Sequence, residues 1–487
     1  MKKTFFTFCM ALMAVLALNA EDYNGTIVVT MGGITRTAEV TVTVTEGENG
    51  LYEFDLDVPI FGIMKMYDVH AATSGDLTVY SAERYVNNTT YGNLRTVMLA
   101  RTVDGMMAAN VTLPDKDVTM WFNTVGDHFQ LPNGDMEAWT NSNGEPDHWH
   151  GFKTATGMWA SFSPALLGQS EDIHEGATGQ YSAVMTAKSA FGTIANGTMT
   201  NGRLNAGSTS ATSTSNNASM SETYDSDFYM PLYAKPDQFK VWLKYQQGTA
   251  NANNKANVSV KTFDGTYYQE PVDKTYTNLS GSIVGGEITA CDWTQFTFPF
   301  DYASYNANHA ISRAIFVTFS TNANPGQGAN NDVLYVDDME LVYLAQMTDL
   351  RYRGVTIDGW DPAITTYNME IAGEPNLNDF VTTFEGVSAY STKSMEQNED
   401  GSYRIAISVV SGDLQTATCY IINVTEPAGK PGDVDGNGFV NISDVTLLIS
   451  YILGNPVTIN EQNADMSHDT QINITDVTML INYIMNN

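Results

Sequence analysis

Near its C-terminus the chain contains the stretch DVDGNGFVNISD, residues 433–444, in which oxygen-bearing side chains recur at fixed positions. They fall at positions 1, 3, 5, 9 and 12, the spacing at which a calcium loop supplies its ligands, and position 7 contributes a backbone carbonyl. Gly438 lies at position 6, where such a loop turns sharply. The stretch therefore predicts a calcium site with ligands from Asp433, Asp435, Asn437, Phe439, Asn441 and Asp444.

A second copy of this stretch, DMSHDTQINITD, occupies residues 465–476. Two of its positions differ in kind, because Ser467 replaces a carboxylate and Thr470 replaces the glycine of the sharp turn. Both changes remove a feature that calcium loops use, so we expect this second site to bind calcium more weakly. The pair of loops would hold two calcium ions, and the ligands of the second would be Asp465, Ser467, Asp469, Gln471, Asn473 and Asp476.

Each loop is followed by a segment with one apolar face. Val445, Leu448, Ile449 and Ile452 stand at positions i, i+3, i+4 and i+7, and the same spacing recurs over residues 477–484. Helices this short are marginal in isolation. We therefore predict two helices that pack against each other through these faces.

The duplicated loop–helix unit of residues 430–487 closely resembles the type I dockerin family. This resemblance implies a docking module that binds cohesin modules on scaffold proteins through positions 10 and 11 of each loop. Position 10 is isoleucine in both copies, which is more apolar than usual for the family. The partner is therefore either an external cohesin-like module or another domain of the same chain, and the contact residues would be Ile442, Ser443, Ile474 and Thr475.

The composition excludes several classes of protein. The formal net charge is −32, because 55 acidic residues outnumber 23 basic ones. A surface of this sign repels nucleic acid, and no stretch is long and apolar enough to predict a transmembrane segment. Residues 1–20 combine a positively charged start with a short apolar run, which is typical of a signal peptide cleaved near Ala20. We expect a protein that is secreted, periplasmic or held at the cell surface.

Residues 21–127 are rich in strand patterns. Two alternating segments, 38–45 and 51–58, flank a Gly/Asn turn and predict a β-hairpin. An antiparallel sheet of this size must close or cover its edges. The stretches 23–29 and 104–111 resemble the calycin-like β-barrel domain of secreted bacterial proteins, which implies a small barrel. Such a barrel either holds a small ligand or is filled by its own side chains, and we favour the filled form.

Residues 128–345 form the largest block, in which strand patterns alternate with irregular loops and no helical periodicity is found. This pattern favours a jelly-roll β-sandwich. Residues 196–223 are rich in Ser, Thr, Asn and Gly, and we predict a long exposed loop because few apolar residues are available for burial. Residues 346–427 resemble the cadherin-like β-sandwich spacers of surface proteins, and a Pro/Gly linker then leads to the C-terminal module, residues 428–487.

The largest block also resembles the family named the putative carbohydrate metabolism domain, a jelly-roll module of secreted bacterial proteins. The resemblance is carried by residues 133–139, by residues 197–203, by Lys235-Pro236 ahead of the strand at Trp242, and by residues 337–340. It implies a role with carbohydrates, without distinguishing binding from catalysis.

If this block binds carbohydrate, aromatic rings should stack on the C–H faces of the sugars. Trp149 and Trp159 lie in loop-rich sequence, so we expect them to be exposed. Trp242 lies between Val241 and Leu243 in a strand, so we expect it in the core. The predicted carbohydrate-binding residues are Trp139, Trp149 and Trp159.

Glycoside hydrolysis would instead need two carboxylates, about 5 Å or about 6.5–9.5 Å apart, one of them with a raised pKa. The spacing of the acidic residues selects no such pair. Asp135 or Glu137, near the first strand, together with Asp337 or Asp338, near the last strand, better fits one structural calcium ion in the jelly roll. The candidate catalytic residues are Asp135, Glu137, Asp172 and Asp332.

Three hypotheses follow from these patterns. The first, which we favour, is a carbohydrate-binding protein of polysaccharide utilisation with a calcium-dependent docking tail. The second is a glycoside hydrolase with its active site on the jelly roll, and the third is a structural surface protein whose β-domains act as spacers. The expected partners are a polysaccharide or oligosaccharide, together with either a cohesin-like module or the small β-sandwich of the same chain.

Overall fold

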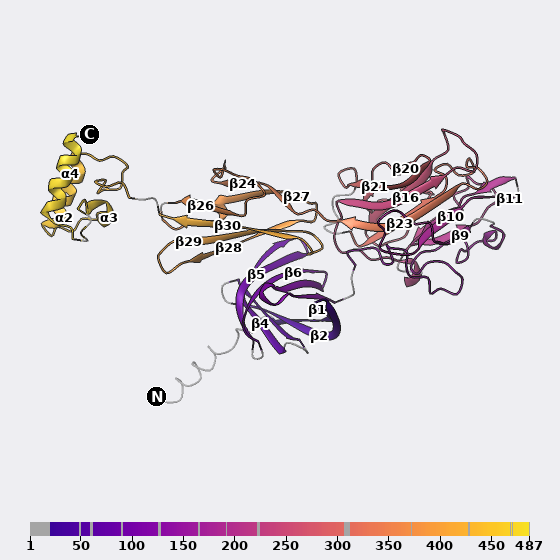
Figure 1. Ribbon diagram of the computed structural model, residues 1–487, viewed down its shortest axis with the longest axis horizontal. Coiled ribbons are helices and arrows are strands. Elements are labelled where there is room, and N and C mark those ends of the chain that lie inside the picture. The colour runs from indigo at the N-terminus through magenta and orange to yellow at the C-terminus, as the bar shows by residue number, and fades with distance from the viewer. Residues whose placement is uncertain are drawn as a thin grey trace, which may run out of the picture. The chain divides into compact units, whose positions relative to one another are not determined.

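The computed structural model describes residues 20–47, 50–58, 62–88, 91–124, 128–163, 166–190, 192–221, 225–305, 312–371, 373–426, 429–467, 469 and 471–486. The predicted signal peptide up to residue 19 lies outside these ranges, and so does Thr470. The described chain is mostly β, and its α-helices lie in the C-terminal tail, as the sequence predicts (Figure 1).

The chain divides into two compact units. The first extends to Leu350 and also includes Thr382–Thr392 and Ser408–Cys419. The second comprises Arg351–Val381, Lys393–Ile407 and the chain from Tyr420 onward. The first unit therefore holds the N-terminal strands and the central block, and the second holds the helical tail.

The N-terminal strands close into an antiparallel barrel, β1 to β8, in which β1 pairs with both β2 and β8. The predicted hairpin is β2 with β3, where Val42 lies opposite Leu56. Buried apolar side chains such as Ile27, Met98 and Phe122 form one cluster, which supports the filled form of the barrel. The elements are β1 (Ala20–Met31), β2 (Ile34–Glu46), β3 (Tyr52–Val58), β4 (Gly62–Ser74), β5 (Leu77–Asn88), β6 (Gly92–Val103), β7 (Met106–Leu113), η1 (Pro114–Lys116) and β8 (Val118–Asn123).

The central block is built on one long sheet with the strand order β13-β22-β17-β19-β21-β16-β23-β10-β9, and β20 pairs with β17. Two small sheets, β14-β15-β18 and β11-β12, accompany it. The elements are η2 (Ala160–Phe162), β9 (Leu166–Ser170), β10 (Ser182–Thr186), β11 (Lys188–Ala190), β12 (Thr193–Ala195), β13 (Thr198–Thr200), β14 (Arg203–Ala206), β15 (Asn216–Met220), η3 (Ser226–Phe228), β16 (Gln238–Gln246), β17 (Ala256–Phe263), β18 (Tyr268–Glu270), β19 (Leu279–Ile283), β20 (Glu287–Ile288), β21 (Cys291–Asp301), β22 (Ala314–Ser320) and β23 (Val333–Val342).

The two halves of this long sheet face each other across a common core. Phe239 of β16 and Phe319 of β22 belong to different halves, yet their ring centroids lie only 6.4 Å apart. Buried and half-buried side chains alternate along β16. In β22 they alternate from residue 317 onward, whereas residues 314–316 are all buried. Each half of the sheet therefore gives one face to the core. This arrangement confirms the predicted β-sandwich.

The prediction of a long exposed loop at residues 196–223 is wrong. The described part of this run contains β13, β14 and β15, and Met199, Leu204 and Ala218 are buried in the core. These strands are only three to five residues long, and their few apolar side chains pack against apolar residues from elsewhere in the block. Local composition therefore underestimated the apolar surface available to them.

The region that follows is all β apart from one short 3₁₀ helix. Its strands form two small sheets with the orders β25-β24-β27 and β26-β30-β29-β28, and β26 runs parallel to β30. The elements are β24 (Gln346–Tyr352), β25 (Val355–Thr356), β26 (Thr366–Glu370), η4 (Leu377–Asp379), β27 (Phe380–Glu385), β28 (Tyr390–Gln397), β29 (Tyr403–Val410) and β30 (Ala417–Thr425).

The tail contains α2 (Ile442–Ile452), α3 (Glu461–Ala464) and α4 (Ile474–Asn486). The predicted packing of the two longer helices is confirmed, because one buried cluster joins Val445 and Leu448 of α2 to Val477 and Leu480 of α4. The rest of the predicted apolar face is not buried. Ile449 of α2 is 38% exposed, so only part of each helix face contacts the other helix.

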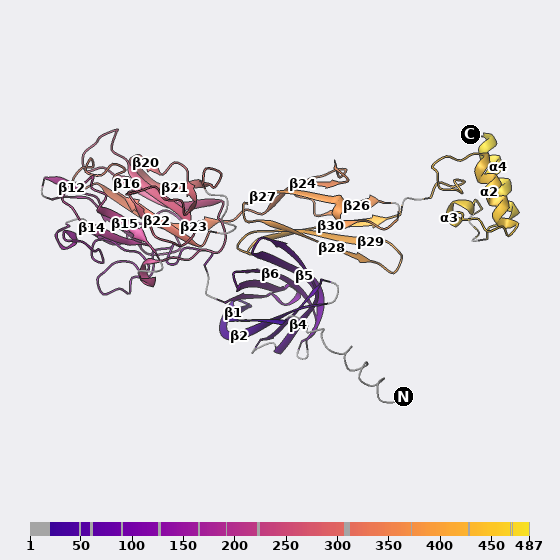
Figure 2. The same cartoon turned by 180° about the vertical axis from the view of Figure 1, so that it is seen from behind.

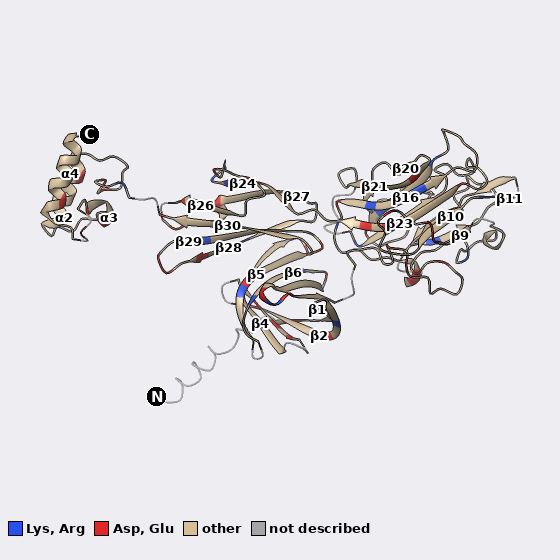
Figure 3. Ribbon diagram, viewed as in Figure 1, with Lys and Arg blue, Asp and Glu red and all other residues tan. Residues whose placement is uncertain are grey.

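The barrel and the central block differ from the tail helices in the sign of their charged residues. Acidic and basic residues both occur on strands of the barrel and the central block, whereas the three tail helices carry acidic residues and no basic ones (Figure 3). Among the described residues, no helix is long and apolar enough to cross a membrane.

Candidate functional site

A pocket of about 620 Å³ lies in the central block, on the face of β17 and β22 that points away from the core. The β11–β12 hairpin and the strands β14 and β15 contribute residues to its lining. Figure 2 shows where β12, β14, β15 and β22 lie in the central block. Its floor carries short polar side chains and one lysine from four neighbouring strands, β13, β22, β17 and β19. These floor residues are Thr198, Ser320, Thr318, Asn257, Ser259, Lys261 and Ser282.

The polarity of the floor follows from strand alternation. In β17, Val258 and Val260 are buried in the core, so the residues that alternate with them must point to the opposite face. Those residues include Asn257 and Ser259, which line the pocket. No described residue forms a hydrogen bond with the side chain of either one. Their amide and hydroxyl groups are therefore open to a ligand in the pocket.

Aromatic side chains form one wall of this pocket. Phe162 is 60% exposed, Trp159 is half-buried, and their ring centroids lie 5.9 Å apart. Both rings flank or belong to the short helix η2, and Phe152 lines the pocket beside them. The pocket thus combines flat apolar rings with open amide and hydroxyl groups.

Of the three tryptophans predicted to bind carbohydrate, Trp159 lines the pocket, and the other two lie elsewhere. The expectation that Trp149 is exposed is wrong, because its side chain is fully buried and its Nε1 donates to the carbonyl of Pro132 at 3.1 Å. No face of that ring is available to a ligand. Trp139 is half-buried, and its Nε1 donates to the carbonyl of Met136.

The expectation that Trp242 lies in the core is also wrong. It is half-buried on the outer face of β16, where the ring of His174 stacks on it with a centroid separation of 4.1 Å. His174 in turn contacts a carboxylate oxygen of Asp338 at 2.7 Å. These contacts attach the segment after β9 to the outer face of the sheet.

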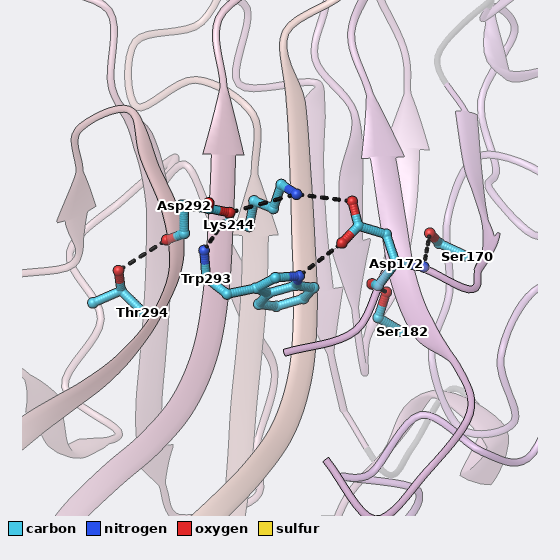
Figure 4. A network of polar contacts seen from close by, with 7 residues as sticks. All are labelled: Ser170, Asp172, Ser182, Lys244, Asp292, Trp293 and Thr294. Atoms are coloured by element: carbon cyan, nitrogen blue, oxygen red, sulfur yellow. Dashed lines mark hydrogen bonds and ion pairs between the residues drawn. The ribbon is translucent and has the colours of Figure 1, made fainter. Parts of the chain in front are cut away.

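Asp172, a candidate catalytic residue, belongs to the same attachment (Figure 4). One of its carboxylate oxygens accepts from Lys244 Nζ at 2.9 Å, and the other accepts from Trp293 Nε1 at 2.9 Å. Its backbone carbonyl accepts from Ser182 Oγ at 2.7 Å. Because both carboxylate oxygens already have partners, this residue holds the segment in place and does not line the pocket.

The other three candidate carboxylates also lie outside the pocket. Asp332 is fully buried and accepts hydrogen bonds from Asn254 Nδ2 and from the backbone N–H groups of Gly248 and Ala329. Glu137 accepts from the backbone N–H groups of residues 180 and 181 at 2.8 and 2.7 Å. Asp135 is exposed. The structure therefore does not gather these carboxylates around one cavity.

Asp337 is the described residue whose environment best fits the structural calcium ion predicted for the jelly roll. Its side chain is buried, and its Oδ2 has no hydrogen-bond partner. Burial raises the pKa of Asp337 to about 7, with smaller contributions from the charges of Asp338 and Glu137. The fit is partial, because these three side chains do not bring carboxylate oxygens within 4.8 Å of one another.

The first tail loop contains an acidic cluster that fits the predicted calcium site. Carboxylate oxygens of Asp433, Asp435 and Asp444 lie within 4.8 Å of one another, the one such acidic group found among the described residues. Gly438 has a φ of 86°, so the sharp turn at position 6 needs glycine. Asp433 accepts from the Gly438 N–H at 2.8 Å, and Asp444 accepts from the N–H groups of Asp435 and Asn441. These bonds hold the oxygens of the loop together.

The second loop repeats these contacts. Asp476 is fully buried, like Asp444, and accepts from the N–H groups of Ser467 and Asn473 at 3.0 and 2.8 Å. These donors stand at the same loop positions as those of the first loop. Its acidic side chains Asp465, Asp469 and Asp476 do not form a group within 4.8 Å. The backbone of the second loop is therefore equivalent to that of the first, but its carboxylate oxygens lie farther apart.

The residues at positions 10 and 11 of the loops are exposed. Ile442 is 69% exposed and Ile474 is 67% exposed, and Ser443 and Thr475 beside them are exposed too. Ile442 and Ile474 are the first residues of α2 and α4, so the helices present them outward. Two equivalent apolar positions are thus available to a partner.

Sequence reasoning missed most of the pocket. Phe162, Asn257, Ser259, Lys261 and Glu270 line it, and none was singled out. The alternation Asn257-Val258-Ser259-Val260-Lys261 was a usable signal for a strand with one polar face. It does not indicate, however, that the polar face is covered by further strands to make a pocket.

Comparison with known protein families supports the resemblances of the tail and of the central block. Residues 431–485 match the model of the dockerin type I domain, and residues 115–342 match that of the putative carbohydrate metabolism domain. No curated protein matches the chain.

Among solved structures, a putative glycoside hydrolase from Bacteroides thetaiotaomicron is 13% identical, over 58% of this chain and 86% of that chain, with a TM-score of 0.34. The xylan-binding domain CBM22-1 from Paenibacillus barcinonensis is 10% identical, over 39% of this chain and 90% of that chain, with a TM-score of 0.18. At these scores neither likeness supports a functional conclusion.

The buried carboxyl of Asp337 predicts a pH-dependent stability. Because its folded pKa is raised above the unfolded value, the native chain holds this proton more tightly, and stability falls as pH rises from about 4 to above 7. Asp337→Asn should remove this loss, which is of the order of a few kcal/mol. The measurement is the unfolding transition of the central block between pH 5 and 8 in a chelator.

The exposed neighbour Asp135→Asn serves as the control and should leave the pH dependence unchanged. An unaltered slope in Asp337→Asn would contradict the assignment of this titration. Calcium added above pH 7 should raise the transition temperature of the unsubstituted chain more than that of Asp337→Asn if the carboxylate also holds the predicted ion.

The first loop should contribute most of the calcium affinity of the tail. Asp433→Ala removes a carboxylate of the acidic group, so it should weaken binding at that site roughly tenfold or more and reduce calcium-induced helix. Asp465→Ala should have a smaller effect. Titration calorimetry of the full chain and difference circular dichroism measure both quantities.

Glu399→Ala, an exposed acidic position outside the tail, is the matched control. Calcium binding and helix content that are unchanged in Asp433→Ala would show that the loop has been wrongly assigned.

Proposed function

We propose that this chain is a secreted carbohydrate-binding protein, in which the pocket of the central block binds an oligosaccharide and the calcium loops of the tail attach it to a partner. The observation that carries the proposal is the lining of the pocket. Aromatic rings stand on one wall, open amide and hydroxyl groups lie on the floor, and one carboxylate is present among the described lining residues. The surrounding charge of −32 suits a soluble protein outside the cytoplasm.

Sugars match both the aromatic wall and the polar floor of this pocket. The C–H faces of a sugar ring are apolar and pack on flat rings such as Trp159 and Phe162. The hydroxyl groups both donate and accept hydrogen bonds, as do the amide of Asn257 and the hydroxyl of Ser259. A pocket of about 620 Å³ lies within the size range of small-molecule sites.

Binding is favoured over hydrolysis in this pocket. Glycoside hydrolases of the usual kind need two carboxylates that flank the bond to be broken. Among the described residues that line the pocket, Glu270 is the single acidic one, and its carboxylate lies 3.8 Å from Lys261 Nζ. The four candidate catalytic carboxylates lie elsewhere, so no second carboxylate is positioned to complete a pair.

The tail supplies the attachment in this proposal. Its match to the dockerin type I domain implies a cohesin partner, and Ile442 and Ile474 are exposed at the loop positions where such a partner would bind. Calcium holds the two loops in the conformation that presents these residues. We favour an external cohesin-like module with an apolar contact surface, because the family match implies a cohesin and the two equivalent contact positions, Ile442 and Ile474, are both apolar.

Loss of an aromatic wall should weaken sugar binding. Trp159→Ala removes a stacking surface, so the affinity for a bound oligosaccharide should fall roughly tenfold, which corresponds to about 1.4 kcal/mol. The measurement is a glycan array on the full chain, followed by calorimetry on the tightest neutral oligosaccharide, with reducing-sugar release assayed in parallel.

Tyr85→Ala, which removes an exposed aromatic ring of the barrel, is the control and should not change affinity. Release of reducing sugar that is lost on mutation of Glu270 would contradict the binding function and favour the hydrolase. Absence of both binding and release would leave the structural role.

The tail should lose its partner when its two exposed isoleucines become charged. The double variant Ile442→Asp with Ile474→Asp should reduce affinity for a cohesin module at least tenfold, because it places two desolvated charges at the contact. Surface plasmon resonance with a panel of cohesin modules gives the affinity, and calorimetry checks that calcium binding is retained.

Val355→Asp, at an exposed valine outside the tail, controls for added charge. Binding of the double variant as tight as that of the unsubstituted chain would place the docking surface elsewhere.

A further inference from the structure

The charge of the pocket is balanced within the pocket itself. Lys261 of β17 and Glu270 of β18 are the two charged residues among its described lining. Their side chains are 19% and 21% exposed, and Lys261 Nζ lies 3.8 Å from Glu270 Oε1. The two charges therefore offset each other inside the ligand site.

Both charged groups also have neutral partners. Lys261 Nζ donates to Ser282 Oγ at 2.6 Å, and Glu270 Oε1 accepts from the hydroxyl of Tyr268 at 3.0 Å. Tyr268 is 2% exposed, which fixes the carboxylate from the core side. A carboxylate of an acidic sugar that approached Lys261 would compete with Glu270 and be repelled by its negative charge. The ammonium group of an amino sugar that approached Glu270 would likewise be repelled by the positive charge of Lys261.

The groups without partners in this pocket are neutral. Asn257 and Ser259 have side chains with no hydrogen-bond partner among the described residues, and both stand on the same strand as Lys261. Paired residues extend this polar surface sideways, because Ser320 lies opposite both Asn257 and Thr198, and Ser282 lies opposite Lys261. The floor thus crosses four strands, or about 14 Å at the usual strand spacing.

We propose that the pocket selects neutral oligosaccharides and rejects acidic ones, with the ion pair of Lys261 and Glu270 as the element that sets this preference. The proposal rests on the proposed function, because it specifies the class of sugar that the same pocket binds. The open amide and hydroxyl groups contact the sugar hydroxyls, and the length of the floor fits a chain of several sugars lying across the strands. Glu270 acts as a specificity-determining residue that excludes carboxylates from Lys261.

The test compares matched sugars on the full chain. Neutral β-1,4-linked gluco-, manno- and galacto-oligosaccharides are titrated beside the same compounds oxidised at C6 to uronates. At least one neutral compound should bind, its oxidised counterpart should bind at least about tenfold more weakly, and the neutral affinity should change less than about twofold with salt. Glu270→Gln leaves Lys261 without its acidic partner, so the ratio of uronate affinity to neutral affinity should rise about tenfold.

Glu287→Gln is the matched control, since Glu287 forms an ion pair with Lys255 outside the pocket lining. Lys261→Met provides a second variant, in which the remaining carboxylate should weaken uronate binding further. Uronates that bind the unsubstituted chain as tightly as the neutral compounds would overturn the inference and leave carbohydrate binding intact. If no neutral or oxidised compound binds, both the selectivity for neutral sugars and the proposed carbohydrate-binding function are overturned. If Glu287→Gln has the same effect as Glu270→Gln, the preference comes from general surface charge, and the role of the ion pair is overturned.

Discussion

The alternation of side chains along β17 and β22 is the constraint on which the rest of the central block depends. A strand sends successive side chains to opposite faces, so a shift of one residue in register would exchange those faces. Burial of Val258 and Val260 in the core places Asn257, Ser259 and Lys261 on the other face of the strand, and no additional contact is needed to orient them. The energy that orders the pocket floor is therefore that of the hydrophobic core beneath it. The floor can be composed of small polar residues because it does not have to contribute to stability.

The parts of the fold that were predicted are those with local periodicity. The alternation of β2 and β3 gave the barrel hairpin, and the spacing of Val445 and Leu448 gave the helix contact of the tail, because in each case the buried face is defined by the segment itself. The segment 196–223 was misjudged because the apolar surface that covers Met199 and Leu204 comes from distant strands. Trp149 was misjudged for the same reason, since a loop residue is buried only when other elements pack over it.

The functional sites show the same difference between features set by local sequence and features set by distant contacts. The acidic cluster of the first tail loop could be predicted, because its members lie within twelve consecutive positions and local hydrogen bonds set the backbone geometry. The full sets of calcium ligands stay predictions. The pocket could not be predicted, because Trp159, Asn257 and Glu270 come from separate elements and meet only through the order of strands in the sheet. The carboxylates proposed for catalysis were selected by residue type, and the structure uses Asp172 and Asp332 to fix loops instead.

The two functional regions differ in how they depend on the surrounding solution. From residue 431 onward the chain has no lysine or arginine, and Lys430, just before the first loop, donates to the carbonyl of Gly438. This one cation offsets only part of the charge of the three carboxylates that the loop brings together. Buried or clustered carboxylates of this kind need a counter-charge, and a bound divalent ion supplies it. The pocket, in contrast, carries its own compensating pair and otherwise neutral groups. The proposed attachment through the tail should therefore depend on the calcium concentration around the protein, while the proposed recognition of a neutral sugar should be nearly independent of both calcium and salt.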